Sequence, residues 1–406
     1  MSTHASPSAA AAGATANTAN TANTADVPFG LSERAPALAT WLDAHAEVLD
    51  TDATLSAEVV PQLAQAGLLR VGVPVELGGA GGTIGDAIDS VAAVASHSFA
   101  AAFVLWGQRT FIEYLLQSPN RGLRERLLPS LLSGELAGAT GLSNAMKYLS
   151  AIEPLQIRAT DRTGTGGTPA WHVTGGLPWI TNLRKQGFVA AAAADHDAGG
   201  PPSIFAIAHD AEGVTRSDDL DLIGLRGTNT AALQMTDTPL DDNDRITDDA
   251  PAWLVRVRPA FLGLQCGMSL GLARRSLAAT SDGGPGARAA VADEVGALAD
   301  QIDTLATRLK SGVAQGEFVT TPAKLFELRI ALAGVVHDAA TLEVQTGGGR
   351  GYLRGLSGVA RRQREAAFVP IVTPSLVQLK NQLAAQRAKS GESEASAAQP
   401  RTGTAS

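Results

Sequence analysis

The chain has 406 residues, of which 45% are hydrophobic and 18% are charged, so it is long enough for two or three domains with a large buried core. Its formal net charge of -8 disfavours nucleic acid as a main partner, and no apolar run reaches the ~18–20 residues that span a bilayer. Cys266 is the only cysteine, which excludes an intrachain disulfide and a thiolate metal cluster and favours a reducing, cytoplasmic compartment.

The composition divides the chain into five segments. Residues 1–28 and 388–406 are low in complexity and are expected to be disordered, and the first lacks the basic start and apolar stretch of a signal peptide. Residues 29–135 have helical periodicity, residues 136–248 have short β-type runs, and residues 249–387 return to helical periodicity. This order predicts an α+β fold with a helical domain, a small antiparallel barrel or sandwich, and a helical bundle.

Particular elements are predicted within these segments. Residues 86–103 are rich in Ala and Val and predict one buried helix. Thr321-Pro322 predicts the start of another helix, because proline is tolerated in a first helical turn. Three runs in the middle segment have the composition of strands and are separated by turn residues: Trp171–Thr174, Phe188–Ala192 and Ser203–Ala208.

A glycine cluster follows the helix that is predicted to start at Thr321-Pro322. The run Gln345-Thr346-Gly347-Gly348-Gly349-Arg350-Gly351-Tyr352 lets the backbone approach something flat or charged, and Arg364-Glu365-Ala366 follows it. This spacing resembles the flavin-contacting turn of the acyl-CoA dehydrogenase family, a Q-x-x-G-G-x-G-[FY] run followed by R-[DE]-A.

Further segments resemble the family in the same order along about 300 residues. Pro74–Gly82 is similar to P-x-[EQ]-x-G-G-x-G, and Ala139–Asn144 stands where the family enters its β domain with a run ending T-E or S-E. Leu177–Asn182, which reads L-P-W-I-T-N, resembles K-x-W-I-T-N-[AG]. Leu222–Thr230 resembles the G-x-R-[GS]-[ST] turn, and Phe261–Ala273 resembles the first helix of the family's C-terminal four-helix bundle.

The resemblance implies a flavin, FAD or FMN, and a set of residues that bind it. Trp179 can stack along a flat heterocycle, and Thr181 can bond its polar edge. The implied cofactor-binding residues are Leu142, Ser143, Trp179, Thr181, Gln345, Gly348, Gly349 and Ser375. In the family the glycine run often serves a neighbouring subunit's cofactor, so a homo-oligomer, a tetramer, is implied as well. A missing R-x-x-F-G segment, where this chain has Ser281–Gly286, favours a looser or smaller flavin.

The carboxylate that the family uses as a general base is missing. Its commonest position, the Glu of Y-E-G-T, reads Thr373 here, and the alternative position reads Val257. Neither side chain can take a proton at neutral pH. The catalytic residue therefore stays unknown, and scattered histidines without ligand spacing predict no metal site.

These losses resemble the dibenzothiophene monooxygenase-like branch, which takes reduced flavin from a separate reductase and needs no α-proton base. Oxidation or oxygenation of a small organic substrate is the favoured function. Two alternatives stay open: α,β-desaturation of an acyl-CoA thioester by an unrecognised base, with an electron-transfer partner, and a catalytically inactive binding scaffold.

Other polar residues receive structural interpretations. Trp106, Gln108 and Tyr114 are interpreted as core or surface residues rather than flavin contacts, and Glu343 is expected on a solvated helix face. The cluster of Arg361, Arg362 and Arg364 either meets a phosphate or is a charge cluster at a helix end.

Overall fold

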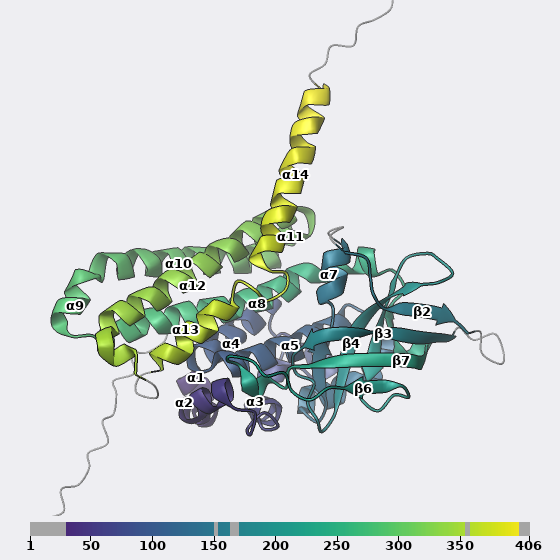
Figure 1. Ribbon diagram of the computed structural model, residues 1–406, viewed down its shortest axis with the longest axis horizontal. Coiled ribbons are helices and arrows are strands. Elements are labelled where there is room, and N and C mark those ends of the chain that lie inside the picture. Colours follow the sequence, from purple (N-terminus) through teal and green to yellow (C-terminus); the bar gives the residue numbers. More distant parts are fainter. Residues whose placement is uncertain (1–29, 150–152, 163–169, 354–357, 398–406) are drawn as a thin grey trace, which may run out of the picture.

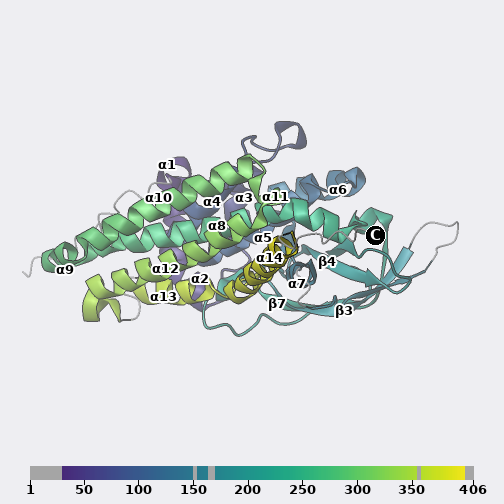
Figure 2. The ribbon, with the colours of Figure 1, turned by 90° about the horizontal axis from the view of Figure 1, so that it is seen from above.

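The computed structural model describes residues 30–149, 153–162, 170–353 and 358–397, and side chains as far as residue 388. The first extension, residues 1–28, lies outside the described residues. The sheet lies at one end of the elongated body and the C-terminal helices at the other, while the N-terminal helices pack between and below them (Figure 1). Turned by 90°, the same body shows the long C-terminal helices side by side (Figure 2).

The N-terminal segment is helical, as predicted, and its elements are α1 (Leu31–Arg34), α2 (Pro36–Thr51), α3 (Val59–Gln65), the short turns η1 (Leu68–Arg70) and η2 (Val75–Leu77), α4 (Ile84–His97), α5 (Phe99–Leu116) and α6 (Arg121–Ser133). The single helix predicted over residues 86–103 is wrong, because the chain breaks at Ser98. Ser98 has extended backbone angles, and its Oγ accepts a hydrogen bond from Ala101 N (3.3 Å). A serine that caps the second helix therefore overrides continuous apolar periodicity.

The start of α4 is fixed by a reciprocal cap. Thr83 Oγ1 accepts from Asp86 N (3.3 Å), and Asp86 Oδ2 accepts from Thr83 N (2.7 Å). The hydrogen bonds from the Thr83 backbone and hydroxyl hold the pKa of Asp86 below its ordinary value of 3.8. The contribution of the cap is therefore present above pH 3.8 and is lost as the pH falls through the lower pKa of the folded state.

We expect Asp86→Asn to lower the free energy of unfolding by about 0.5–1 kcal/mol at pH 7, because one terminal N–H loses its charged acceptor. Urea unfolding at several pH values between 7 and 3 measures the effect. The difference between the variant and the unaltered protein should shrink below pH 3.8. A difference that stays constant down to pH 3 would contradict the role of the ionised carboxylate.

The middle segment forms one curled eight-stranded sheet in the order β6-β7-β3-β2-β4-β5-β8, with β1 paired to β4. Its strands are β1 (Ala137–Thr140), β2 (Arg158–Asp161), β3 (Ala170–Ile180), β4 (Phe188–His196), β5 (Ser203–Ala208), β6 (Val214–Arg216), β7 (Ala231–Asp241) and β8 (Arg245–Thr247). The three predicted strands are confirmed as parts of β3, β4 and β5. The sheet is mixed, because β4 pairs in parallel with both β1 and β2.

The C-terminal segment is helical, as predicted, and consists of α8 (Ala250–Ala279), the turn η5 (Thr280–Asp282), α9 (Pro285–Ala290), α10 (Ala292–Ala314), α11 (Glu317–Thr320), α12 (Pro322–Gly351), α13 (Val359–Phe368) and α14 (Leu376–Ala397). The start of a helix at Pro322 is confirmed. A Cβ at Gly271 of α8 would lie 2.1 Å from Ala92 O, so this glycine permits the close approach of α4. Beyond its first turns α14 leaves the body (Figure 1), and it runs past residue 387.

Buried ion pairs join α13 to the rest of the molecule. Glu343 on α12 is 1% exposed and accepts from Arg362 Nε at 2.9 Å, so the expected solvated position is wrong. Glu343 can be buried because the guanidinium of Arg362 supplies the opposite charge. Arg361 pairs with Glu365, and Arg364 Nε donates to the fully buried Asp50 Oδ2 (2.7 Å). Each of the three arginines thus has a carboxylate partner.

Candidate functional site

The first part of the site lies where β3 ends against α5. Thr181 is buried, and its Oγ1 donates to Thr228 O (3.2 Å). α5 packs against this strand end, since a Cβ at Gly107 would lie at contact distance, 3.4 Å, from Thr181 Cγ2. Gln108 Oε1 accepts from Asn182 Nδ2 (2.9 Å), so Gln108 is a core residue, as interpreted from the sequence.

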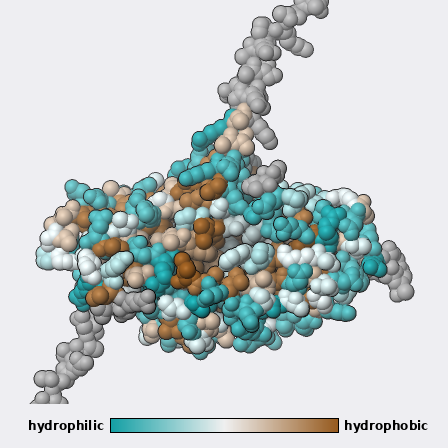
Figure 3. All heavy atoms as spheres, viewed as in Figure 1, coloured by the Kyte–Doolittle hydropathy of each residue, from teal (hydrophilic) through white to brown (hydrophobic). Residues whose placement is uncertain are grey.

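Trp179 stands on the same end of β3 with its ring open. The side chain is 62% exposed, which is unusual for so large an apolar surface in a folded protein. Figure 3 shows apolar side chains gathered across the middle of one face, between the base of α14 and the sheet. An exposed indole is free to stack on a flat heterocycle, as the sequence predicts for this residue.

Leu142 and Ser143 approach the same end of the sheet from β1. Leu142 is fully buried, and Ser143 is the half-buried first residue of α7 (Ser143–Leu149). Gly141 packs tightly beside them, because a Cβ there would lie 2.5 Å from Ala191 O and 3.3 Å from Ile180 Cδ1. Ser143, Trp179 and Thr181 therefore belong to one corner of the β domain, and Leu142 offers this corner only its backbone.

α8 is bonded to α5 on one side and to the turn between α13 and α14 on the other. Trp106 Nε1 donates to Phe261 O (3.2 Å), and one turn further along α8 Gln265 Nε2 donates to Thr373 O (3.0 Å). Thr373 is half-buried, whereas Val257, at the alternative base position, is fully buried. Neither of the two positions therefore supplies an ionisable group to the site.

An aromatic cluster fills the space between α5, α8 and α13. Phe103 stacks on Trp106 at a centroid distance of 5.3 Å, and Phe368 meets Phe103 edge-on at 5.0 Å. Phe261 completes the cluster against Trp106 at 5.2 Å. Trp106 is thus buried in the core, as interpreted from the sequence. The cluster packs α5 against α8 and α13 with apolar rings.

The glycine cluster lies at the opposite end of α12 from the Thr373 turn. The non-helical φ and ψ of Gly348 (53° and -152°) break α12 near its end, and the regular part before this kink is roughly 39 Å long. Gln345, Gly348 and Gly349 are exposed, and added Cβ atoms at Gly348 and Gly349 would meet nothing within 4 Å. The packing of the described residues gives no reason for three successive glycines, so the segment suits the close approach of another molecule.

The structure does not bring all the implied cofactor residues together in one chain. Ser143, Trp179 and Thr181 share a corner, and the glycine end of α12 lies far from it (Figure 1). Ser375 caps α14, because its Oγ accepts from Gln378 N (3.3 Å), and it belongs to the turn that holds Thr373. One chain thus presents a ring-binding corner and, separately, an open glycine segment.

The residues of the corner fit a flavin ring. An isoalloxazine needs an apolar stacking surface, hydroxyl or backbone groups at its polar edge, and glycine at its phosphates. The exposed indole of Trp179, the hydroxyl of Ser143 and the backbone around Leu142 and Thr181 have this chemistry. The open glycines of α12 have the chemistry that a phosphate or an adenosine requires.

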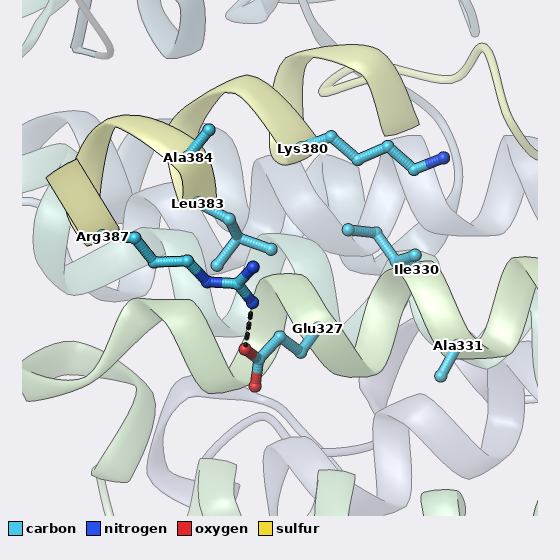
Figure 4. A pocket seen from close by; sticks show the side chains of 7 residues that line it. All are labelled: Glu327, Ile330, Ala331, Lys380, Leu383, Ala384 and Arg387. Carbon is cyan, nitrogen blue, oxygen red and sulfur yellow. Dashed lines mark hydrogen bonds and ion pairs between the residues drawn. The ribbon is translucent and has the colours of Figure 1, made fainter.

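Two shallow cavities lie elsewhere on the chain. The first, of about 390 Å³, lies between α12 and α14 and is lined by Glu327, Ile330, Lys380 and Leu383 among others (Figure 4). The second, of about 360 Å³, lies beside Thr51 and Arg226. Within the described residues there is no group of three or more His, Cys, Asp or Glu side chains arranged to hold a metal ion, and no helix long and apolar enough to cross a membrane.

One buried charged residue that bonds to α8 was missed by the sequence interpretation. Arg329 lies in an apolar stripe of α12 and is fully buried, and its guanidinium bonds Gln265 of α8. The available signal was a charged residue between Leu328 and Leu332 on a helix that is otherwise apolar at these positions. Cys266, next to Gln265, is also buried, and burial raises the pKa of its thiol to about 12, so it is no nucleophile.

Comparison with known proteins agrees with this architecture. Residues 36–135 match the family described as acyl-CoA dehydrogenase, N-terminal domain. The chain also resembles a glutaryl-coenzyme A dehydrogenase structure, with a TM-score of 0.74, 19% identity and coverage of 87% of this chain and 94% of that one. Residues 36–135 thus match the N-terminal domain of the acyl-CoA dehydrogenase family, and the chain as a whole has the fold of a solved acyl-CoA dehydrogenase.

The proteins that the chain resembles have names that describe different reactions. An L-evernosamine nitrososynthase from Micromonospora sp. is 27% identical over 208 residues, which are 49% of this chain and 47% of that protein. The match therefore spans less than half the length of this curated relative. The structure of KijD3 with FMN and an amino-keto sugar nucleotide has a TM-score of 0.69 and 20% identity, and covers 89% of this chain and 94% of that one.

Proposed function

We propose that the chain is a flavin-dependent oxidoreductase that holds the ring at the corner formed by Ser143, Trp179 and Thr181. The observation that carries the proposal is the open indole of Trp179, 62% exposed, beside a hydroxyl and backbone groups on a family fold. A bound flavin supplies the redox chemistry. The chain stacks the ring on Trp179 and bonds its polar edge from Ser143 and Thr181.

The cofactor is FAD or FMN, and its distal half meets the glycine segment of another copy of the chain. Gln345, Gly348 and Gly349 are exposed and lie far from the ring-binding corner of their own chain, so one protomer does not supply the full set. A homotetramer in a reducing, cytoplasmic compartment accounts for this arrangement and for the single cysteine. The structure of KijD3 in complex with FMN supports FMN as the cofactor. The structure of an acyl-CoA dehydrogenase in complex with FAD supports FAD.

Oxygenation of a small organic substrate is the proposed reaction, with reduced flavin supplied by a separate reductase. Thr373 and Val257 occupy the two positions where the resemblance places a carboxylate base, and neither can accept a proton at neutral pH. A reaction that needs no α-proton abstraction agrees with these residues. The dibenzothiophene monooxygenase-like branch, which the sequence resembles, likewise needs no α-proton base.

Dehydrogenation of an acyl-CoA, with electrons passed to a protein partner, is the second candidate. Glu365 favours it, because this fully buried carboxylate follows the arginine of the R-[DE]-A element and precedes the aromatic residue Phe368. Its Oε1 accepts from Phe99 N (3.3 Å), and its Oε2 has no partner among the described residues. Burial raises the pKa of Glu365, as a general base in a dry site requires.

Two assays on the purified protein separate these candidates. The first supplies FMN or FAD reduced by a reductase and measures substrate-dependent oxygen consumption with product formation. The second supplies acyl-CoA thioesters of different chain lengths with an artificial electron acceptor. Oxygen-dependent turnover without acyl-CoA oxidation is expected. Acyl-CoA oxidation would contradict the proposed reaction, and failure to bind either flavin would contradict the proposed cofactor and favour an inactive scaffold.

Glu365→Gln tests the alternative base directly. We expect oxygen-dependent turnover per folded protein to change by less than about threefold, because the amide oxygen can still accept from Phe99 N and from Arg361 and no proton abstraction is required. Glu327→Gln, an exposed change on α12, is the control. An acyl-CoA oxidation that falls by about a hundredfold or more in Glu365→Gln alone would instead identify Glu365 as the base.

A further inference from the structure

A buried arginine that has no carboxylate partner among the described residues lies in the first third of α12. Arg329 is fully buried, and its Nε donates to Gln265 Oε1 (2.8 Å) while its Nη2 donates to Val369 O (2.6 Å). Both acceptors are neutral, and Nη1 has no partner among the described residues. A guanidinium buried in this way is costly, so its position calls for an explanation other than stability.

The arginine sets the direction of a chain of hydrogen bonds. Arg329 can only donate, so Gln265 must turn its Oε1 toward the guanidinium, and its Nε2 then faces Thr373 O, to which it donates (3.0 Å). Arg329 thus holds the turn between α13 and α14 twice, directly at Val369 and through Gln265 at Thr373. In these hydrogen bonds to α8 and α12 the turn contributes the backbone carbonyls of Val369 and Thr373.

The turn is linked to the ring-binding corner through α8 and α5. Gln265 is one turn along α8 from Phe261, whose carbonyl accepts from Trp106 Nε1 (3.2 Å). The next residue of α5, Gly107, packs against Thr181. A continuous set of contacts therefore connects Thr181, α5, α8 and the Thr373 turn.

We propose that Arg329 and Gln265 are positioning residues, which hold the Val369–Thr373 turn in place as one wall of the flavin site. This proposal rests on the proposed function, and it adds the two residues that hold the Val369–Thr373 turn beside the flavin. The turn carries the half-buried Thr373 at the position where the resemblance places a carboxylate. Arg329 and Gln265 fix the position of Thr373.

Gln265→Glu separates positioning from packing. The carboxylate keeps the shape of the side chain and gains an ion pair with Arg329, but it cannot donate to Thr373 O and repels it. We expect an unfolding temperature no lower than that of the unaltered protein. In the flavin-free protein, the amides of Ile371 and Val372 should exchange with deuterium about fivefold faster or more, because the turn is released. Gln301→Glu, the same chemical change at an exposed position of α10, is the control and should leave exchange unchanged.

The flavin-loaded protein gives the second measurement. In Gln265→Glu, but not in Gln301→Glu, the absorption spectrum of bound flavin and the rate at which oxygen reoxidises it should change, by threefold or more in the rate. Unchanged exchange in the turn would overturn the proposal, as would a released turn with an unaltered flavin spectrum and reoxidation rate. Amide exchange is measured without flavin, so it tests whether Gln265 holds the turn even in a protein that binds no flavin. Failure to bind flavin would contradict the proposed function separately.

Discussion

Replacing Glu343 by Ala should lower the free energy of unfolding by about 3–5 kcal/mol, because it breaks a buried ion pair. Glu343 is 1% exposed and Arg362 is 3% exposed, and the guanidinium bonds both carboxylate oxygens. Removing the carboxylate leaves a buried positive charge between α12 and α13. Urea unfolding monitored by far-UV circular dichroism measures the change.

Glu327→Ala is the matched control on the same helix. Glu327 also pairs with an arginine of a later C-terminal helix, Arg387 of α14, at 3.4 Å (Figure 4). Both side chains of this pair are more than half exposed, so it should contribute no more than about 0.5 kcal/mol. Equal losses in the two variants would show that Glu343 is not held in a water-free pair.

The sequence was sufficient for the features that depend on local pattern. Strand-type composition and turn residues placed β3, β4 and β5, and proline placed the start of α12, because these signals act within a few residues. The W-I-T-N run and the Gly-Leu-Ser run were both assigned to the ring, and they meet at one corner. That meeting depends on the pairing of β1 with β4 and on the position of α5, neither of which a single segment reveals.

The features that were missed depend on partners far along the chain. Glu343 was expected in solvent because its partner, Arg362, lies 19 residues away beyond a glycine turn. Arg329 received no interpretation, since its acceptors lie 64 and 40 residues away on α8 and in the Thr373 turn. The break at Ser98 was missed for a different reason: a capping hydroxyl competes with apolar periodicity, and the periodicity was given more weight.

Trp179→Ala should weaken flavin binding about tenfold without destabilising the flavin-free protein. The ring is 62% exposed, so its loss removes little packing and should change the free energy of unfolding by less than about 0.5 kcal/mol. Stacking on a flat ring, by contrast, contributes roughly 0.5–1.5 kcal/mol beyond the apolar area it buries. Titration of FMN and FAD, followed by the quenching of flavin fluorescence, gives the dissociation constants.

Ile223→Ala is the control for Trp179→Ala, because Ile223 is 86% exposed and lies on the loop between β6 and β7, beside the second cavity. It should leave both flavin affinities unchanged. If both variants bind flavin as the unaltered protein does, the open indole is not the stacking surface, and the ring must lie elsewhere. If Trp179→Ala weakens FAD and FMN by the same factor, the indole contacts the ring that both cofactors share, and the choice between them is made at the glycine segment of α12.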